Sequence, residues 1–333
     1  MSPARGHSRI SDSHRLKVRR AKTAYKHKRS SQGILAKLIF VLCSVFFVLA
    51  IWKLFNSWQN SQWITGTRLT IVVASDNPKV YSYNPQAEKL VVFEIPANTQ
   101  IETSRGYGQW FAGSLWKLGE QEKLRGELLR ESVQKSLGLP VDGWIEERGE
   151  ALFAPRKLGV MSALFEALTT TRIKSNLTFF DRLHLLMKVG IVGISARREM
   201  DLTATGVLKK EKLDDGADGY SVVPDKAKLA FEGLRDDLVF AEEMKVVIVN
   251  TSKKSGLAND VGQIATILGV RIIGAQTSSE KINECEIRGE KSDLNSFSAR
   301  RMIKIFDCAE VNTKTTSPQD LELWLGESFS KRF

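Results

Sequence analysis

The sequence predicts a mixed α/β protein attached to one apolar helix near its N-terminus. Three observations indicate this class: an uncharged apolar run follows a basic N-terminal segment, strand-like alternation fills the region after it, and strand and helix patterns alternate along the last 90 residues. The order expected in that last part is β-α-β-β-α-β, a ferredoxin-like split arrangement. The expected fold class is therefore α/β (α+β), in a chain of 333 residues that is long enough for two outer domains.

The net charge of +11 is concentrated at the N-terminus. Residues 1–37 hold eleven of the 49 lysines and arginines and one acid, so the rest of the chain carries a net charge of about +1. This excludes a fold-wide basic surface for nucleic acid, and no nucleic-acid partner is expected. Residues 1–33 are predicted to be a disordered basic tail that sets topology and attracts anionic lipid, because they have too few large apolar residues to fold.

Residues 34–55 are predicted to be a transmembrane signal anchor. Residues 38–52 contain no charge, and the 22 residues of the whole segment would make about 33 Å of helix, enough for a bilayer core. The basic flank places the N-terminus in the cytoplasm and the C-terminal domains outside it, so the expected location is the cell membrane, with a single pass. The alternatives are a buried soluble helix and a cleaved secretory signal, although residues 56–65 lack the small-residue pattern of a cleavage site.

The outer part begins with a polar connector at 56–67, and a first domain is predicted at 68–200. The elements expected there are strands near 69–73, 80–83 and 90–95, a helix at 119–137, a strand at 141–146, a helix from 156 and a helix from 178 to 190. Asn-Pro turns separate the strands, and Thr178 with Asp181 three residues later forms a capping-box pattern. Strands followed by helices and a further strand favour an α/β layer over a β-sandwich.

Residues 201–243 are charged and only weakly periodic, which predicts an extended connection with one or two edge strands. A second domain is predicted at 244–333. Its expected elements are a strand at 244–249, a helix ending at 269, strands at 270–275 and 283–288, a helix at 297–306 and a strand at 321–325.

The histidine and cysteine content limits the chemistry. His184 is the only histidine after the tail, which excludes a multi-histidine zinc site and most hydrolase triads. Cys285 and Cys308 are the two cysteines expected outside the membrane, and they indicate either a disulfide or a pair of free buried thiols. The acidic turn at 214–219 lacks the glutamate spacing of an EF-hand, so no metal site is expected.

Five segments of the chain resemble the LytR-CpsA-Psr family. Two resemble that family's C-terminal domain, and Asn250 followed by the Gly256-Leu257-Ala258 set is their most specific feature. Three resemble pieces of its catalytic domain. The segments are MKVVIVNTSKKSGLA at 244–258, DLELWLGESF at 320–329, LVVFEIPAN at 90–98, LGLPVDGW at 137–144 and NLTFFDRLHL at 176–185. The resemblance thus implies a degenerate LytR-CpsA-Psr-like domain at 68–200 and a LytR C-terminal-like domain at 244–333.

The resemblance implies a bacterial cell-envelope protein that moves a glycopolymer from an undecaprenyl pyrophosphate carrier onto peptidoglycan. Arginines and a carboxylate-held Mg²⁺ would neutralise charge on the leaving phosphate. This chain departs from the family there. Ala97 and Asn98 follow Pro96 where the family has Arg-Asp, and the paired arginines expected after Trp144 have no counterpart. Asp76 could stand for one metal-binding aspartate, and the second has no clear match.

These departures predict a non-catalytic relative that binds cell-wall glycan, a polyprenyl-phosphate lipid or a partner protein, in addition to the bilayer. The alternative is an active phosphotransferase, and Mg²⁺ is expected only under that alternative, with no cofactor otherwise. No catalytic residue is supported. The candidate ligand contacts, for which core packing is the competing interpretation, are Asp76, Asn98, Arg105, Trp110, Trp116 and Lys117.

Overall fold

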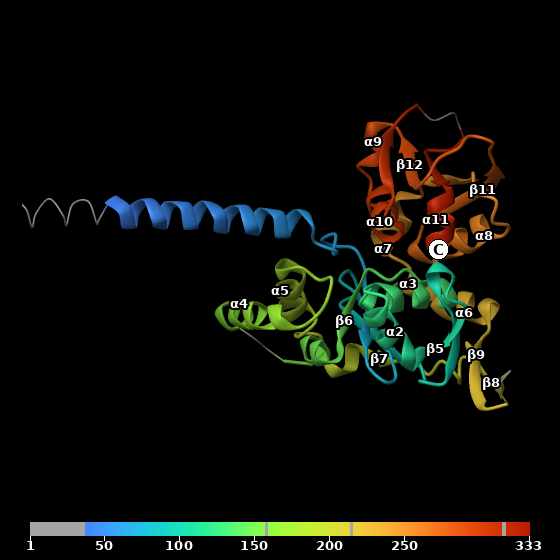
Figure 1. The fold of residues 1–333 in the computed structure, drawn as a ribbon, viewed down its shortest axis with the longest axis horizontal. Helices are drawn as coiled ribbons and strands as arrows, with labels where there is room; N and C mark the ends of the chain where they lie inside the picture. Colours follow the sequence, from blue (N-terminus) through green and yellow to red (C-terminus); the bar gives the residue numbers. More distant parts are fainter. Residues whose placement is uncertain (1–36, 157–158, 214–215, 315–317) are drawn as a thin grey trace, which may run out of the picture. The chain divides into compact units, whose positions relative to one another are not determined.

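The computed structural model describes residues 37–156, 159–213, 216–314 and 318–333, and the chain divides into two compact units, 1–59 and 60–333. In the described part of the first unit, residues 37–59 form the helix Lys37–Gln59, of 23 residues, whose most apolar 18-residue stretch has a mean hydropathy of 2.6 (Figure 1). None of this helix is buried, and its length and composition are sufficient to cross a bilayer. The predicted tail at 1–33 lies outside the described residues.

The second unit begins with a five-stranded sheet in the order β6-β1-β2-β3-β7. Its strands are β1 (Leu69–Ala74), β2 (Lys79–Asn84), β3 (Lys89–Glu94), β6 (Gly143–Glu146) and β7 (Arg197–Glu199). The first three form an antiparallel meander, whereas β6 is parallel to β1 and β7 is parallel to β3. The strands expected near 69–73, 80–83, 90–95 and 141–146 are therefore confirmed.

This sheet is covered on both faces, because every residue of β1 is buried. Ile71 and Val73 face a core that includes α4 (Val160–Thr169) and α5 (Phe179–Lys188), and the alternate residues face a core that includes α2 (Leu115–Gln121) and α3 (Gly126–Leu137). The capping box of α5 is present as expected, with the Thr178 hydroxyl and the Asp181 carboxylate each accepting a bond from the other's backbone.

The helix expected at 119–137 is wrong as a single element, because α2 ends at Gln121 and α3 begins at Gly126. Lys123 and Arg125 between them have positive φ angles of 60° and 54°. The chain folds back so closely that a Cβ on Gly119 would lie 2.0 Å from the Arg125 carbonyl oxygen. Non-glycine residues rarely adopt this backbone conformation, so periodicity alone could not reveal the break.

A four-stranded sheet with the order β5-β4-β9-β8 lies next in the unit. Its strands are β4 (Thr99–Glu102), β5 (Gln109–Phe111), β8 (Leu208–Lys212) and β9 (Asp218–Val222). The one or two strands expected within 201–243 are present as β8 and β9, of which β8 lies at the edge of the sheet. The expected extended connection is incomplete, because the segment also forms α6 (Pro224–Phe231) and α7 (Asp237–Glu242). Pro224 begins α6, and the Asp236 side chain caps α7 by accepting bonds from two backbone amides.

The last sheet has five strands in the order β11-β10-β14-β12-β13. Its strands are β10 (Lys245–Asn250), β11 (Arg271–Thr277), β12 (Cys285–Gly289), β13 (Ala309–Asn312) and β14 (Leu321–Leu325), and its helices are α8 (Leu257–Leu268), α9 (Lys291–Leu294), α10 (Phe297–Phe306) and α11 (Glu327–Arg332). β10 is parallel to β11 and β14, and β12 is parallel to β13 and antiparallel to β14.

The expected ferredoxin-like split arrangement is wrong for this sheet. A split unit needs another strand between its two parallel strands, but α8 returns the chain so that β11 lies directly beside β10. In addition, α10 leads into β13, which completes a second crossover unit with β12. The short, largely exposed sequence of β13 carries no apolar alternation that would predict a strand. A disulfide joins Cys285 to Cys308, with their Cα atoms 4.5 Å apart.

Arg301 lies fully buried where α10 meets the first sheet. Its guanidinium is ion-paired with Asp142, and its Nε lies 3.5 Å from Asp236 Oδ2. Asp142 also accepts the Thr70 amide at 2.7 Å, and Asp236 accepts the Arg68 amide at 2.8 Å. Burial alone would lower the pKa of Arg301, but the two carboxylates outweigh burial and raise it. This Arg301 network, made of Arg301, Asp142 and Asp236, fixes α10 to the first sheet and to α7.

Candidate functional site

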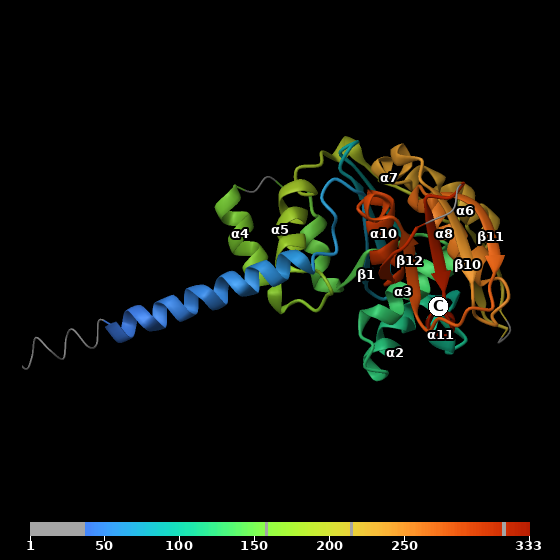
Figure 2. The same cartoon turned by 90° about the horizontal axis from the view of Figure 1, so that it is seen from above.

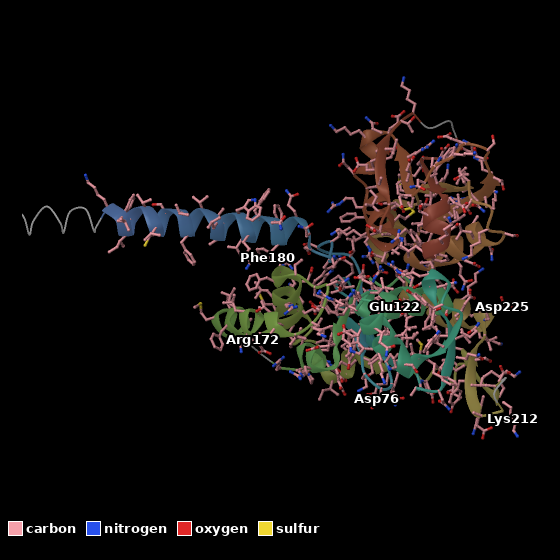
Figure 3. All side chains as sticks on the ribbon, in the orientation of Figure 1. Asp76, Glu122, Arg172, Phe180, Lys212 and Asp225 are labelled. Atoms are coloured by element: carbon pink, nitrogen blue, oxygen red, sulfur yellow. A yellow bond between two sulfur atoms is a disulfide. The ribbon has the colours of Figure 1, made fainter. Side chains whose placement is uncertain are left out.

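Asp76 and Asn98 lie at one edge of the outer unit, where the loops after β1 and β3 meet. The Asn77 side-chain oxygen accepts the Ala97 amide at 2.7 Å, and the Gly113 amide donates to the Ala97 carbonyl at 3.1 Å. A Cβ at Gly113 would lie 2.6 Å from the Asp76 carbonyl oxygen, so only glycine fits between these loops. The Asp76 side chain itself is exposed (Figure 3). The structure therefore brings Asp76 and Asn98 together around Ala97.

The other side chains near this edge serve packing and sheet contacts. Asn98 donates its amide to the Asp218 carbonyl at 3.0 Å, which ties the loop to the edge of β9. The Trp116 ring is half-buried, with its centroid 5.5 Å from that of Trp144. Lys117 is exposed on α2. Trp116 thus follows the core-packing interpretation, and Lys117 is an accessible cation beside this edge.

Arg105 does not join the edge at Asp76. Asn98 precedes β4 and Arg105 comes after it. The four residues of this strand span about 13 Å, so the two side chains lie at opposite ends of β4. The Arg105 guanidinium makes two bonds to Glu131 of α3, at 2.8 and 2.9 Å, and Arg130 Nη2 lies 3.7 Å from the same carboxylate. Burial would lower the pKa of Arg105, but the bond to Glu131 and the charges of Glu131 and Glu127 together outweigh burial and raise it. We call Arg105, Glu131 and Arg130 the Glu131 network; its charges are used within the fold.

The described residues contain no group of three or more His, Cys, Asp or Glu side chains arranged to hold a metal ion. Asp214 and Asp215 of the acidic turn lie outside the described residues. One cavity of about 320 Å³ near β2 and β3 is acidic, with Glu94, Glu150 and Glu199 in its lining. Such a lining repels phosphate, so this cavity does not suit a pyrophosphate.

A second cavity, of about 300 Å³, has a polar lining contributed by β4, β5, α3, β9 and α8. We call it the polar cavity. Its polar side chains are Gln100, Glu102, Gln109, Lys135, Ser136, Ser221, Asp260 and Gln263. In β4 these side chains alternate with the buried Thr99 and Ile101, so the strand places one face in the core and the other in the cavity.

Charges around the polar cavity are balanced. Lys135 Nζ lies 2.7 Å from Glu102 Oε1, and the Ser136 hydroxyl donates to the Glu102 carbonyl at 2.9 Å. Burial raises the pKa of Asp260, although Lys254 and Lys135 oppose this. Burial and the nearby Lys135 lower the pKa of Lys254. The lining is therefore rich in hydrogen-bonding groups and carries little net charge.

Exposed aromatic residues border the polar cavity on β5. Phe111 pairs with Gln100 across the β4–β5 ladder, so the two side chains share a face, whereas Trp110 pairs with Ile101 on the opposite face. Both aromatic rings are exposed, and the Trp110 indole donates to the Tyr107 carbonyl at 2.9 Å. Of the predicted contacts, Trp110 is thus the one closest in sequence to the cavity lining, although it lies on the other face of the strand.

Sequence reasoning missed the polar cavity. Its lining comes from strands and helices up to 163 residues apart, from Gln100 to Gln263. The local signals for such a cavity are weak. Gln100 and Glu102 alternate with Thr99 and Ile101 along one strand, and Asp260 and Gln263 are three residues apart on α8. Neither pattern differs from an ordinary solvent-facing surface.

Comparisons with known proteins give low similarity. No protein-family model and no curated protein matches the chain. Among solved structures, TagV of Bacillus subtilis matches at 8% identity and a TM-score of 0.42, over 51% of this chain and 97% of that one. TagT of Bacillus subtilis matches at 14% identity and 0.37, over 52% and 91%. A TagT structure titled as a LytR-CPS2A-psr family protein with bound octaprenyl pyrophosphate lipid matches at 12% identity and 0.37, over the same shares. TM-scores below 0.5 do not by themselves establish a shared fold.

Proposed function

We propose that this chain is a membrane-anchored, extracytoplasmic protein of the bacterial cell envelope that binds a cell-wall glycan without transferring it. The polar cavity is the observation that carries the proposal. The apolar helix Lys37–Gln59 supports the single-pass anchor, and the segments that resemble the LytR-CpsA-Psr family support the envelope location. The basic flank before the helix supports a cytoplasmic N-terminus.

The polar cavity suits a ligand rich in hydroxyl groups. Amide side chains such as Gln100, Gln109 and Gln263 both donate and accept hydrogen bonds, as sugar hydroxyls do. The Lys135–Glu102 pair and Asp260 add charged partners without a large net charge. A volume of about 300 Å³ lies at the lower end of the range for small-ligand sites.

The same residues argue against pyrophosphate transfer. Ala97 stands where the resemblance places an arginine, and it offers no charge to a phosphate. Arg105 donates to Glu131 through its Nε and Nη2, so recruiting it to a phosphate would break both of these bonds. Loss of two or three such cations would lower a phosphotransfer rate by several orders of magnitude.

Binding of glycan is tested with the full-length protein in lipid nanodiscs and soluble glycan strands released from purified cell walls. We expect saturable binding by calorimetry, weakened about tenfold or more in Gln100→Ala/Gln263→Ala, since each lost hydrogen bond costs about 0.5–1.5 kcal/mol. The control is Gln121→Ala, an exposed glutamine at the end of α2, which should bind like the wild type. Equal binding by all three proteins would remove the polar cavity from the proposal.

The alternative function, a LytR-CpsA-Psr-type phosphotransferase with Mg²⁺, is favoured by the meeting of Asp76 and Asn98 at one edge. It is tested with a polyprenyl pyrophosphate-linked glycan and Mg²⁺. We expect no release of the lipid phosphate above the protein-free rate. Release that disappears in Asp76→Asn would establish the alternative and overturn the non-catalytic proposal.

A further inference from the structure

Helix α4 carries its large apolar residues on the outside. Met161, Phe165 and Leu168 are 78%, 70% and 58% exposed, and their spacing of four and three residues puts them on one face. The opposite face is formed by Ala163 and Ala167, which are fully buried in the core beneath the first sheet. An ordinary surface helix has the reverse distribution, with large apolar side chains inside and polar ones outside.

Two more exposed apolar residues follow α5, the helix that packs beside α4. Ile191 and Ile194, just after α5, are 53% and 79% exposed. The Arg156 amide donates to the Gly190 carbonyl at 2.7 Å, which brings this turn beside the segment that leads into α4. In both Figure 1 and Figure 2, α4 lies beyond α5 at the outer edge of the unit. Several large exposed apolar side chains in one part of a protein surface indicate a contact with another apolar phase.

The charges near the stripe favour an anionic surface. Glu166, the only acid on α4, is neutralised by Arg156, with the two side chains 2.8 Å apart. Arg172, labelled in Figure 3, follows α4 and is exposed, and Lys188 at the end of α5 is also exposed. An apolar stripe with a cationic border is the composition of helices that lie in a membrane interface.

The residues that directly follow the apolar helix are bonded to α5. Asp181, at the start of α5 and fully buried, holds the segment that follows the apolar helix: it accepts bonds from the Ser61 hydroxyl at 2.5 Å and from the Gln62 and Trp63 amides at 3.0 Å each. Only Asn60 lies between Gln59 and Ser61 in the sequence, so the Cα atoms of these two residues are at most about 7 Å apart.

We propose that α4 is an interfacial helix, in which Met161, Phe165 and Leu168 insert into the boundary between headgroups and acyl chains of the membrane that carries the anchor. The inference rests on the proposed anchoring by Lys37–Gln59. It assigns the exposed face of α4 to lipid. A second copy of the chain and a protein partner are the competing occupants.

The experiment uses the full-length protein in vesicles of phosphatidylglycerol and phosphatidylcholine. A spin label is placed at Phe165→Cys in a Cys43→Ser background, and electron paramagnetic resonance measures its access to oxygen, which enters lipid, and to a water-soluble nickel chelate. The matched control is Leu229→Cys on α6, where the leucine is 66% exposed. We expect an oxygen-to-nickel access ratio several-fold higher at 165 than at 229.

Each other outcome overturns the inference. Equal ratios at 165 and 229 would place α4 in water. Exclusion of both reagents at 165 would show that protein covers the stripe. A third label, at Val48→Cys, distinguishes failure of the interfacial helix from failure of the anchor. Nickel access at 48 would overturn the anchoring itself. Lipid exposure at 48 together with water exposure at 165 would overturn only the interfacial helix.

Discussion

The Arg301 network and the Glu131 network both join arginines to carboxylates, but they differ in their access to water. The side chains of Arg301 and Asp142 are each 1% exposed, whereas Arg105 is 31% and Glu131 10% exposed. Water screens the second pair and not the first, so similar contacts should contribute very different amounts to stability. In both places the arginines hold the fold, which shows that counting arginines in the sequence overestimates the cations available to a ligand.

The largest effect is expected from Arg301→Met. The substitution leaves Asp142 and Asp236 buried without their cation, and breaking a buried pair in this way costs about 3–5 kcal/mol. Urea unfolding of the detergent-solubilised protein measures the loss. Arg300→Met, at an exposed position on the same helix, should change the free energy of unfolding by less than about 0.5 kcal/mol. If the two variants unfold alike, the distinction between the networks fails.

The disulfide should give the next largest effect. Cys308 lies two residues after the end of α10, so the bond to Cys285 holds the helix that carries Arg301 against β12. Replacing both cysteines with serine should cost about 2–4 kcal/mol for a closed loop of 23 residues. Thermal unfolding with and without reductant provides the check, because reductant should lower the melting temperature of the wild type and leave the double variant unchanged.

Acid should act on the carboxylates beside the Glu131 network. Glu127 accepts bonds from Arg130 at 2.7 Å and from the Trp144 indole at 2.8 Å. Burial tends to raise the pKa of Glu127, but Arg130 and these bonds lower it below 4.5. A depressed folded-state pKa gives stability that is present above 4.5 and is lost as pH falls through the folded value.

Glu127→Gln should therefore show a smaller loss of stability than the wild type as pH falls below about 4.5. At pH 7 it should be less stable by about 1–2 kcal/mol, after allowance for its partial exposure. Unfolding midpoints recorded across this pH range test both statements. Parallel curves for the two proteins would mean that Glu127 does not contribute the difference.

Arg105→Met should have the smallest effect on stability, at most about 1 kcal/mol, because Arg105 is 31% exposed and Arg130 and Arg332 remain 3.7 and 3.8 Å from Glu131. Urea unfolding in low and high salt measures it. A loss as large as that of Arg301→Met would show that exposure does not separate the two networks.

Local patterns predicted the elements whose neighbours lie close in sequence. The strands of the β1–β2–β3 meander are joined by short Asn-Pro turns, and the α5 capping box depends only on Thr178 and Asp181. The helices within 201–243 were missed although α6 carried a signal, a proline at its start with Ala227 and Phe231 buried four residues apart. High charge in that segment obscured the short apolar stripe.

The site could be predicted only in part, because side-chain partners are non-local. Asp76 and Asn98 follow β1 and β3, whose loops meet, whereas the partner of Arg105 is Glu131, 26 residues later in the sequence. The order of the last sheet depended on β13, whose four residues carry no apolar pattern. The polar side chains of the polar cavity come from five strands and helices, and no one of them carries a pattern that would indicate it.

The attachment of Ser61, Gln62 and Trp63 to Asp181 sets a limit on truncation. A soluble version of the outer unit that starts at Asn60 keeps all three bonds to this carboxylate. One that starts at Ile64, the next buried apolar residue, removes all three, and the fully buried Asp181 carboxylate then loses bonds that offset its burial, although it keeps those from Thr178. The first four residues after the apolar helix therefore belong to the folded outer unit, and a shorter protein should express poorly even though every strand and helix is retained.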